Sequence, residues 1–543
     1  MKIKKAQYAV LVVLSFILVT GFTTISHYGI SWDEPFGIHT VEQNYEVVIG
    51  NKPDTGTLTQ FYGIAFDGLA ELLFQFKKRI PFNPSKLSKA ENQTPQEISK
   101  QDMLDRIAIK HVLTFSTSLI AYLSVVGIVS ILCGPNGAWL GAVVLALFPR
   151  WWGHAFFNAK DIPFASLMIL CVFFGAHLIK EYLKDGSDQG QHHRNLAFSI
   201  FFGILAGLLS GIRIGGVVFL FFIPFTHFVL VDKRKIVSEF IKFAPCYFQM
   251  FLAWFMITVL FYPSAWSNPI RQILKTVYRI SDYSDWHMQV LFNGQFVLAQ
   301  SLPRSYLPQW LVMTIPIIFQ LGFVAGLVLI ILRYRRFSIL QKAIVILTGL
   351  EVFALPGMAI VKKSTMYDGM RHFLFMLPGV AAIATAAMIW LYQGIVNTKR
   401  KILAIILMVF LLIAVIFDMV MLHPYEYVYF NKGFGGLKKA FNQYETDYWG
   451  LSLRKAVEWI NRNVNIPAQV LIGAADLEIA SILVKPHIQC LKYPNDESGE
   501  NLNKPFYYIS LTRWNGHKDF PECPVVFEEA RQTVPLAVVK KCG

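Results

Sequence analysis

Two adjacent carboxylates, Asp33 and Glu34, follow the first apolar segment closely, within the run Ser31-Trp32-Asp33-Glu34-Pro35. A carboxylate at a membrane surface is partly desolvated, and desolvation raises its pKa. Such a group can accept the proton of an acceptor hydroxyl or amine during group transfer. A purely structural role is also open, in which Asp33 caps a helix that begins near Pro35.

A second polar cluster lies in a short connection between two later apolar segments, residues 149–163. It contains Arg150, His154, Lys160 and Asp161. A tight turn needs none of these groups, so they are candidates for binding or catalysis. The alternative is that they anchor the segment ends at the membrane interface.

Further polar residues are expected on the same side of the membrane. They are Arg213, Lys362, Lys363, Tyr367, Arg371 and His372. Basic residues are scarce in the outer loops of membrane proteins, so their presence there requires a cause. A bound lipid phosphate would supply one through charge-assisted hydrogen bonds, and contact with anionic headgroups would supply another.

The composition indicates what holds these groups in place. The chain has 543 residues, 54% of them hydrophobic and 16% charged, and its mean hydropathy is +0.45. Soluble proteins have about 25% charged residues, so a soluble enzyme, a disordered chain and a secreted disulfide scaffold are excluded. The net charge of +15 is typical of basic cytoplasmic loops and does not indicate nucleic-acid binding. We therefore expect a mainly α-helical, polytopic membrane protein.

About eleven transmembrane helices are expected from the lengths of the apolar segments. These segments cover roughly residues 6–25, 107–132, 138–150, 162–180, 196–211, 214–231, 243–262, 309–332, 338–360, 372–393 and 402–422. Basic clusters at 233–235, 333–336 and 399–401 each follow an even-numbered segment. By the positive-inside rule, this pattern predicts a cytoplasmic N-terminus.

Two domains are predicted: a transmembrane domain, residues 1–422, and a small extracytoplasmic α/β domain, residues 423–543. The first domain has two large external loops, at 27–106 and 263–308. In the second domain we expect a helix at 450–463 and strands at 470–472 and 506–511. Its three cysteines allow one disulfide with one thiol left over, and the sequence leaves the pairing open: Cys490, Cys523 and Cys542.

Several well-known catalytic motifs are absent from the sequence. There is no Gly-x-x-x-x-Gly-Lys-Ser/Thr loop of ATP-driven pumps, no His-Glu-x-x-His motif and no Asp-x-Asp pair. No cofactor is therefore indicated, and no residue pattern calls for a divalent metal, which stays possible. The predicted spans hold few acids, chiefly Glu351 and Asp418, whereas ion-coupled transporters usually place several ionisable groups there.

The order of these motifs resembles that of the C-type membrane glycosyltransferases. Within this family, the chain is similar to bacterial relatives of dolichyl-phosphate-mannose protein mannosyltransferases and of aminoarabinose lipid A transferases. Trp32-Asp33-Glu34 resembles the acidic motif of the first external loop, and Lys160-Asp161-Ile162-Pro163 resembles the second acidic site. Arg213, within 207–220, resembles a basic residue that interrupts paired spans.

Three downstream runs are similar to a bacterial subgroup of the family: 302–306, 423–431 and 445–450. The resemblance covers roughly residues 1–450, and the tail from about residue 465 matches no family pattern. The long first loop also departs from the family.

The resemblance implies a lipid-linked sugar donor and inversion at the anomeric carbon. It makes Asp33 the general base, with Glu34 as its neighbour and Asp161 as the second acidic residue. The candidates for binding the donor phosphate rest on charge and location: Lys160, Arg213, Arg371 and His372. The candidates for binding other parts of the substrates are Trp32, His154, Tyr306 and Tyr367.

The leading hypothesis is therefore an integral-membrane, mannosyltransferase-like enzyme. It would move a sugar from a polyprenyl-phosphate donor to a lipid, glycan or protein acceptor on the outer membrane face. The expected location is a bacterial inner membrane, with the active face and the C-terminus in the periplasm. A transporter or flippase of lipid-linked glycans is the main alternative, and an assembly protein that functions through its tail is a third.

Overall fold

The computed structural model describes residues 2–50, 58–79, 95–184, 189–281, 286–493 and 505–543. Parts of the two predicted external loops, at 51–57, 80–94 and 282–285, lie outside the described residues. The α-helices are α1 (Lys2–Thr24), α2 (Asp33–Val48), α3 (Ala65–Arg79), α5 (Pro95–Cys133), α6 (Trp139–Ala146), α7 (Pro149–His154), α8 (Asp161–Tyr182), α9 (Gln189–Ile212), α10 (Phe219–Leu230), α11 (Ile236–Leu260), α12 (Pro269–Ser281), α13 (Tyr306–Thr314), α14 (Ile317–Arg333), α15 (Ile339–Lys362), α16 (Met376–Gly394), α17 (Thr398–Leu422), α18 (Gly436–Ala440), α19 (Leu453–Asn463) and α20 (Leu477–Leu483). The strands are β1 (Gln289–Phe292), β2 (Gln295–Leu298), β3 (Ala468–Ile472), β4 (Ile488–Lys492), β5 (Phe506–Leu511), β6 (Val525–Arg531) and β7 (Val534–Cys542).

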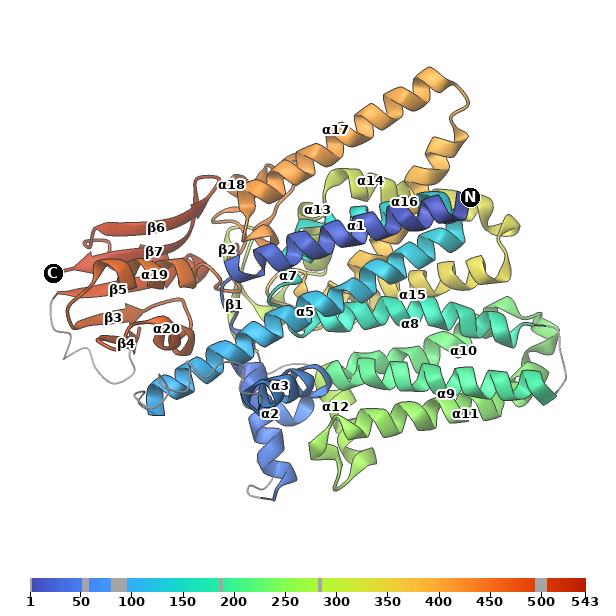
Figure 1. Cartoon of the computed structure of the whole chain (residues 1–543), viewed down its shortest axis with the longest axis horizontal. Helices are drawn as coiled ribbons and strands as arrows, with labels where there is room; N and C mark the ends of the chain where they lie inside the picture. The colour runs from blue at the N-terminus through green and yellow to red at the C-terminus, as the bar shows by residue number, and fades with distance from the viewer. Residues whose placement is uncertain (1, 51–57, 80–94, 185–188, 282–285, 494–504) are drawn as a thin grey trace.

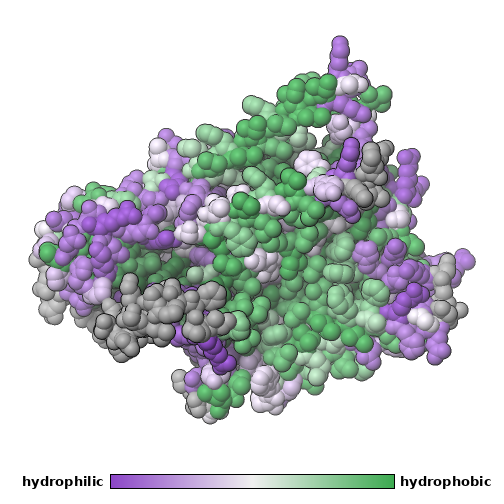
Figure 2. Space-filling model, viewed as in Figure 1, coloured by the Kyte–Doolittle hydropathy of each residue, from purple (hydrophilic) through white to green (hydrophobic). Residues whose placement is uncertain are grey.

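The helices of the first four-fifths of the chain form a membrane-spanning bundle. Among the described residues, nine helices are long and apolar enough to cross a membrane, and two apolar stretches are shorter, at Pro135–Ala146 and Ile214–Leu230. A broad hydrophobic band covers the bundle, with hydrophilic surface at its two ends (Figure 2). These features confirm the predicted polytopic helical fold. Two of the eleven expected spans, 138–150 and 214–231, correspond to the two shorter apolar stretches.

One expected span is shorter than its apolar pattern indicated. The segment 309–332 contains two helices, α13 and α14, which are separated at Ile315 and Pro316. A proline disfavours helical geometry at the preceding residue, and Ile315 is extended, with ψ of 134°. The Asn431 side-chain amide donates to the carbonyl oxygens of Val312 and Ile315, at 2.6 and 3.1 Å. It thereby satisfies backbone groups that the end of α13 leaves unpaired.

The pieces outside the bundle gather at the end where α1 finishes, away from the N-terminus. Figure 1 shows α2, the β1–β2 hairpin and the C-terminal sheet at this end. The hairpin turns at Asn293 and Gly294, both of which have positive φ. Asn-Gly suits a tight hairpin turn because both residues tolerate this conformation.

The C-terminal part is a small α/β unit with a five-stranded mixed sheet of order β4-β3-β5-β7-β6. β3 is parallel to β4 and β5, whereas β7 is antiparallel to β5 and β6. The expected helix near 450–463 and the two expected strands are confirmed as α19, β3 and β5. Three residues from the helical part share the hydrophobic core of this unit: Ile30, Ile38 and Ile107.

Residues 425–451 pack differently from the sheet that follows them. Tyr425, Tyr427, Trp449 and Leu451 belong to the same hydrophobic cluster as the helix bundle. The boundary at residue 422 stays a prediction, and this linking segment joins the sheet firmly to the bundle.

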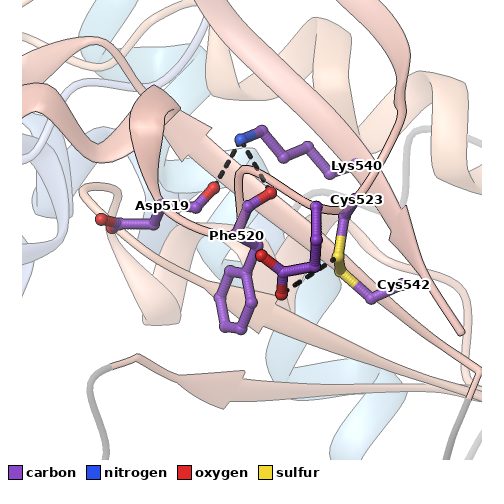
Figure 3. The surroundings of a disulfide bond; sticks show 6 residues. Asp519, Phe520, Cys523, Lys540 and Cys542 are labelled. Atoms are coloured by element: carbon purple, nitrogen blue, oxygen red, sulfur yellow. Dashed lines mark hydrogen bonds between the residues drawn. A yellow bond between two sulfur atoms is a disulfide. The ribbon is translucent and has the colours of Figure 1, made fainter.

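One disulfide fixes the end of the sheet. Cys523, which precedes β6, is bonded to Cys542 at the end of β7 (Figure 3). Cys490 is a free thiol. Lys540 lies beside this bond and donates hydrogen bonds to the carbonyl oxygens of Asp519 and Phe520. The expected single disulfide is therefore present. The sequence left its pairing open, and the structure pairs Cys523 with Cys542.

Candidate active site

A cavity of about 300 Å³ lies where the span ends meet the C-terminal unit. It is lined by Trp32, Asp33, Phe36, Tyr62, Lys160, Arg213, Trp286, Met288, Tyr367, Asp368, Arg371, His372, Tyr448, Trp449, Arg513 and Trp514. These residues come from segments distant in the sequence, which the fold brings together. Seven of the lining residues are site residues predicted from the sequence: Trp32, Asp33, Lys160, Arg213, Tyr367, Arg371 and His372.

Asp33 is the first residue of α2 and has a partly exposed side chain. The Arg371 guanidinium donates a hydrogen bond to the Asp33 carboxylate at 3.1 Å. Burial alone would raise the pKa of this carboxyl, but Arg371, Lys160 and Arg213 lower it below its usual value. The expected upward shift is therefore wrong for the unliganded protein, because nearby cations outweigh desolvation. The side chain also makes no helix cap.

Lys160 and Arg213 lie at the ends of α8 and α9. Arg213 forms an ion pair with Asp161, whose backbone N–H donates to the Asn158 side chain at 2.9 Å. The Lys160 ammonium lies over the rings of Phe36 and Tyr62, at 4.1 and 4.6 Å from their centroids.

Lys160 differs from the other cations of the cavity. Among the described residues, no carboxylate lies within ion-pair distance of its ammonium, whereas the three arginines each have such a partner. Burial lowers the pKa of Lys160 to about 8, although Asp33 and Asp67 counteract this effect. Lys160 is thus a buried cation available to an anionic ligand.

An alternating row of charges connects Asp33 with the C-terminal unit. Arg371 pairs with Asp33 and, at 3.5 Å, with Asp368. Asp368 accepts a hydrogen bond of 2.6 Å from Arg513, and the Arg513 guanidinium lies 3.5 Å from Glu445. Buried charges of this kind require partners of opposite sign, so the row fixes the orientation of Arg371.

Aromatic side chains form much of the remaining cavity wall. The rings of Trp286 and Tyr367 are stacked, with centroids 4.2 Å apart. Trp514 contacts Trp32 edge-to-face at 6.2 Å. His372 lies against Tyr367, and burial, together with Arg371 and Arg213, lowers the pKa of His372 well below its usual value. The imidazole is therefore neutral at pH 7.

Four predicted site residues lie outside the cavity lining. Glu34 points to α5, where it contacts His111 at 2.8 Å, and its carboxylate accepts the Ser31 backbone N–H at 2.8 Å. Asp161 lies behind Arg213 and orients it. The two other residues, His154 and Tyr306, are described next.

His154 is buried and hydrogen bonded to Asn158 and Tyr448, at 3.0 and 3.3 Å. The Tyr306 hydroxyl accepts the Gly369 backbone N–H at 3.0 Å. Both residues therefore support the loops that carry cavity residues and do not face the cavity themselves.

Several lining residues were not singled out from the sequence. Asp368 lies within a segment already noted for its charges, between Tyr367 and Arg371, and could have been found there. Arg513 and Trp514 lie in the tail, where no pattern connects them to the membrane part. Among the described residues, no group of three or more histidine, cysteine or acidic side chains could hold a metal ion.

No protein-family model and no curated protein sequence matches the chain. Solved structures similar to it include ArnT from Cupriavidus metallidurans in the apo state, with 11% identity, a TM-score of 0.49 and coverage of 99% of this chain and 98% of that one. For the same protein bound to undecaprenyl phosphate, the identity is 11% and the TM-score is 0.45, with coverage of 98% of this chain and 97% of that one. The oligosaccharyltransferase of Archaeoglobus fulgidus, tethered to an acceptor peptide, gives 13% identity and a TM-score of 0.43, over 80% of this chain and 56% of that one.

Proposed function

We propose that the protein is a membrane glycosyltransferase that uses a polyprenyl-phosphate sugar as donor. One observation carries this proposal: a carboxylate, Asp33, shares a cavity at the span ends with an excess of cations. Among the described residues, the lining carries four cations, Lys160, Arg213, Arg371 and Arg513, and two carboxylates, Asp33 and Asp368. Asp161 and Glu445, outside the lining, pair with Arg213 and Arg513, so Lys160 is the cation without an ion-pair partner in the described part of the chain. A cavity with this charge balance suits a phosphate on a lipid that lies in the adjacent membrane.

The cations have a direct role in the proposed reaction. The bond between the anomeric carbon and the phosphate oxygen breaks, and its electron pair stays on that oxygen. Negative charge on the departing phosphate then grows, and prearranged cations stabilise it. Lys160 suits this role because it has no carboxylate partner among the described residues, and Arg213 lies beside it in the lining.

Asp33 is the proposed general base. An acceptor hydroxyl or amine attacks the anomeric carbon from the face opposite the phosphate, which inverts the configuration, and its proton passes to Asp33. In the unliganded protein the pKa of Asp33 is lowered by the cations around it. A bound phosphate would neutralise part of this positive charge and so raise the pKa of Asp33, which makes it a stronger base once the donor is present.

The proposed location of the reaction is the outer face of a bacterial inner membrane, with the N-terminus in the cytoplasm. This orientation is supported by the basic clusters at 233–235, 333–336 and 399–401, which follow the positive-inside rule. The sugar is left open, and a mannosyl donor is one member of the class to be tested.

A donor panel tests the proposal. The purified full-length chain in detergent is incubated with polyprenyl phosphates that carry different sugars, with mixed carbohydrate, lipid and peptide acceptors. Mass spectrometry then detects free polyprenyl phosphate. We expect release from at least one donor, together with an acceptor that has gained the sugar in inverted configuration. A folded protein that releases no polyprenyl phosphate across the panel would contradict the proposal.

A further inference from the structure

The C-terminal unit contributes one cation and one indole to the cavity lining, Arg513 and Trp514. The cations Lys160, Arg213 and Arg371 come from segments that adjoin the membrane spans. Trp514 comes from the turn after β5, and Trp286 precedes the β1–β2 hairpin. In the proposed reaction a lipid-linked phosphate approaches from the spans, which leaves the side that carries Trp514 for the incoming acceptor.

Trp514 is held in an unusual backbone conformation. Its φ is +51°, and Asn515 follows with φ of +61°. Asparagine tolerates this left-handed region, but a bulky aromatic residue rarely adopts it. Such conformations persist only where the surroundings enforce them, and they are concentrated at functional sites. Glycine would satisfy the same turn without strain, so the tryptophan ring itself requires an explanation.

Hydrogen bonds on both sides of Trp514 hold its backbone in this conformation. Arg513 donates to the Tyr448 carbonyl oxygen at 2.9 Å, and its other nitrogens contact Asp368 and Glu445. The Tyr508 hydroxyl donates to the Gly516 carbonyl oxygen at 2.9 Å, on the other side of the turn. The turn is therefore fixed at both ends, and the ring between them is directed to the cavity lining.

The contacts of Trp514 leave part of its surface for a ligand. The Arg513 guanidinium lies 4.5 Å from the ring centroid, and the indole N–H donates to the Gln289 carbonyl oxygen at 3.0 Å. The side chain is only half-buried. An aromatic face carries partial negative charge, which attracts the C–H groups on one face of a pyranose ring.

We propose that Trp514 forms a subsite for a pyranose ring of a carbohydrate acceptor, so that the C-terminal unit selects the acceptor. This inference rests on the proposed glycosyltransferase function and names the acceptor class. Arg513 is a positioning residue in this subsite, because both its terminal guanidinium nitrogens are hydrogen bonded within the protein and its Nε lies 3.5 Å from the Glu445 carboxylate.

Binding of simple pyranosides tests the subsite without any turnover. Saturation-transfer difference NMR is recorded on the full chain, in a detergent without a sugar headgroup, with methyl pyranosides of glucose, mannose, galactose and N-acetylglucosamine. A short serine- and threonine-containing peptide is the comparison probe. We expect saturation of the C–H protons on one face of at least one pyranoside, and none of the peptide.

Variants assign the signal to the ring. Trp514→Ala and Trp514→Leu are expected to weaken pyranoside binding about tenfold, whereas Trp514→Phe retains most of it. Trp266→Ala is the matched control, because Trp266 is half exposed and lies outside the cavity lining. Trp514→Leu keeps the apolar bulk, so the subsite can still be tested if the alanine variant does not fold.

The outcomes separate this inference from the proposed function. No pyranoside binding to the wild type, equal binding by Trp514→Leu, or binding of the peptide alone would overturn the subsite. If donors release polyprenyl phosphate but pyranosides do not bind, the subsite fails and the transferase function stands. If pyranosides bind through Trp514 but no donor reacts, the subsite stands and the transferase function fails.

Discussion

Arg371 donates a hydrogen bond of 3.1 Å to Asp33, across 338 positions of the sequence. This pair is the centre of the charged cavity, since Arg371 also contacts Asp368 and stacks on Trp449. A donor phosphate would compete with Asp33 for the same guanidinium. In the proposed reaction, the pair would therefore link donor binding to the basicity of Asp33 before any acceptor arrives.

The pH dependence of the reaction should reflect the loss of the proton, and so of the charge, of Lys160. Because its pKa is lowered to about 8, Lys160 loses its charge as the pH rises through that value, and an anionic donor then binds less well. We expect kcat/KM for the donor to decline above about pH 8. This parameter reports the free enzyme, so initial rates at low donor concentration are the appropriate measurement.

Lys160→Arg should remove the decline, because arginine stays charged throughout this range. Lys438→Arg, at an exposed position outside the cavity, should leave it unchanged. An unaltered decline in Lys160→Arg would exclude Lys160 as its source.

Arg513 should stabilise the contact between the C-terminal unit and the bundle. Arg513→Met leaves the buried Glu445 without its cationic partner and leaves Asp368 with Arg371 alone, which costs about 3 kcal/mol. Thermal unfolding in detergent should show a clear decrease in apparent Tm. Arg462→Met is the control, because Arg462 is 77% exposed and its pair with Glu458 is a surface contact, worth little.

A double-mutant cycle checks the partner of Arg513. Combining Arg513→Met with Asp368→Asn should cost less than the sum of the two single changes, by about 1 kcal/mol or more. Additive costs would show that the two side chains do not interact in solution.

Glu445 should make stability depend on pH. Burial raises its pKa to about 7, against the opposing effect of Arg513, whereas in the unfolded chain it ionises near its usual value of 4.5. Between pH 4.5 and pH 7 the Glu445 carboxyl is therefore protonated in the folded state and ionised in the unfolded chain. Stability therefore decreases by about 3 kcal/mol as the pH rises from about 4.5 to 7, and Glu445 causes no further change above that range.

Glu445→Gln isolates this effect, because it removes the titrating group and keeps the shape. The apparent Tm difference between the variant and the wild type should change between pH 5 and pH 8, in favour of the variant at the higher pH. A difference that is the same at both values would contradict the raised pKa.

The sequence predicted the parts of the fold that depend on hydropathy and local pattern. Long apolar segments predict the spans, the adjacent carboxylates after the first span point to Asp33, and polar residues that an outer loop does not need point to Lys160, Arg213 and Arg371. The apolar composition of 309–332 predicts one helix, because it masks the break that Pro316 imposes between α13 and α14. Hydropathy reports burial in the membrane, and it does not report where backbone hydrogen bonding is interrupted.

The sequence was less informative where tertiary contacts decide. Asp33 and Glu34 are neighbours in the chain, but successive helical residues point in different directions, so one lines the cavity and the other contacts His111. Arg513 and Trp514 were missed because their approach to Asp368 depends on how the C-terminal unit docks on the bundle. The direction of the Asp33 pKa shift likewise depends on cations from three distant segments.

The most direct test of the central claim is a comparison of Asp33→Asn with the wild type, with donor binding and turnover measured separately. The change keeps the shape of the side chain and removes its basicity. We predict that kcat falls by about 10²–10⁴-fold, while the donor binds at least as tightly, because the carboxylate no longer competes for Arg371. Asp102→Asn, which alters an ion pair with Lys78 away from the cavity, should behave as the wild type. Turnover by Asp33→Asn within a few-fold of the wild-type rate would contradict the assignment of Asp33 as the base.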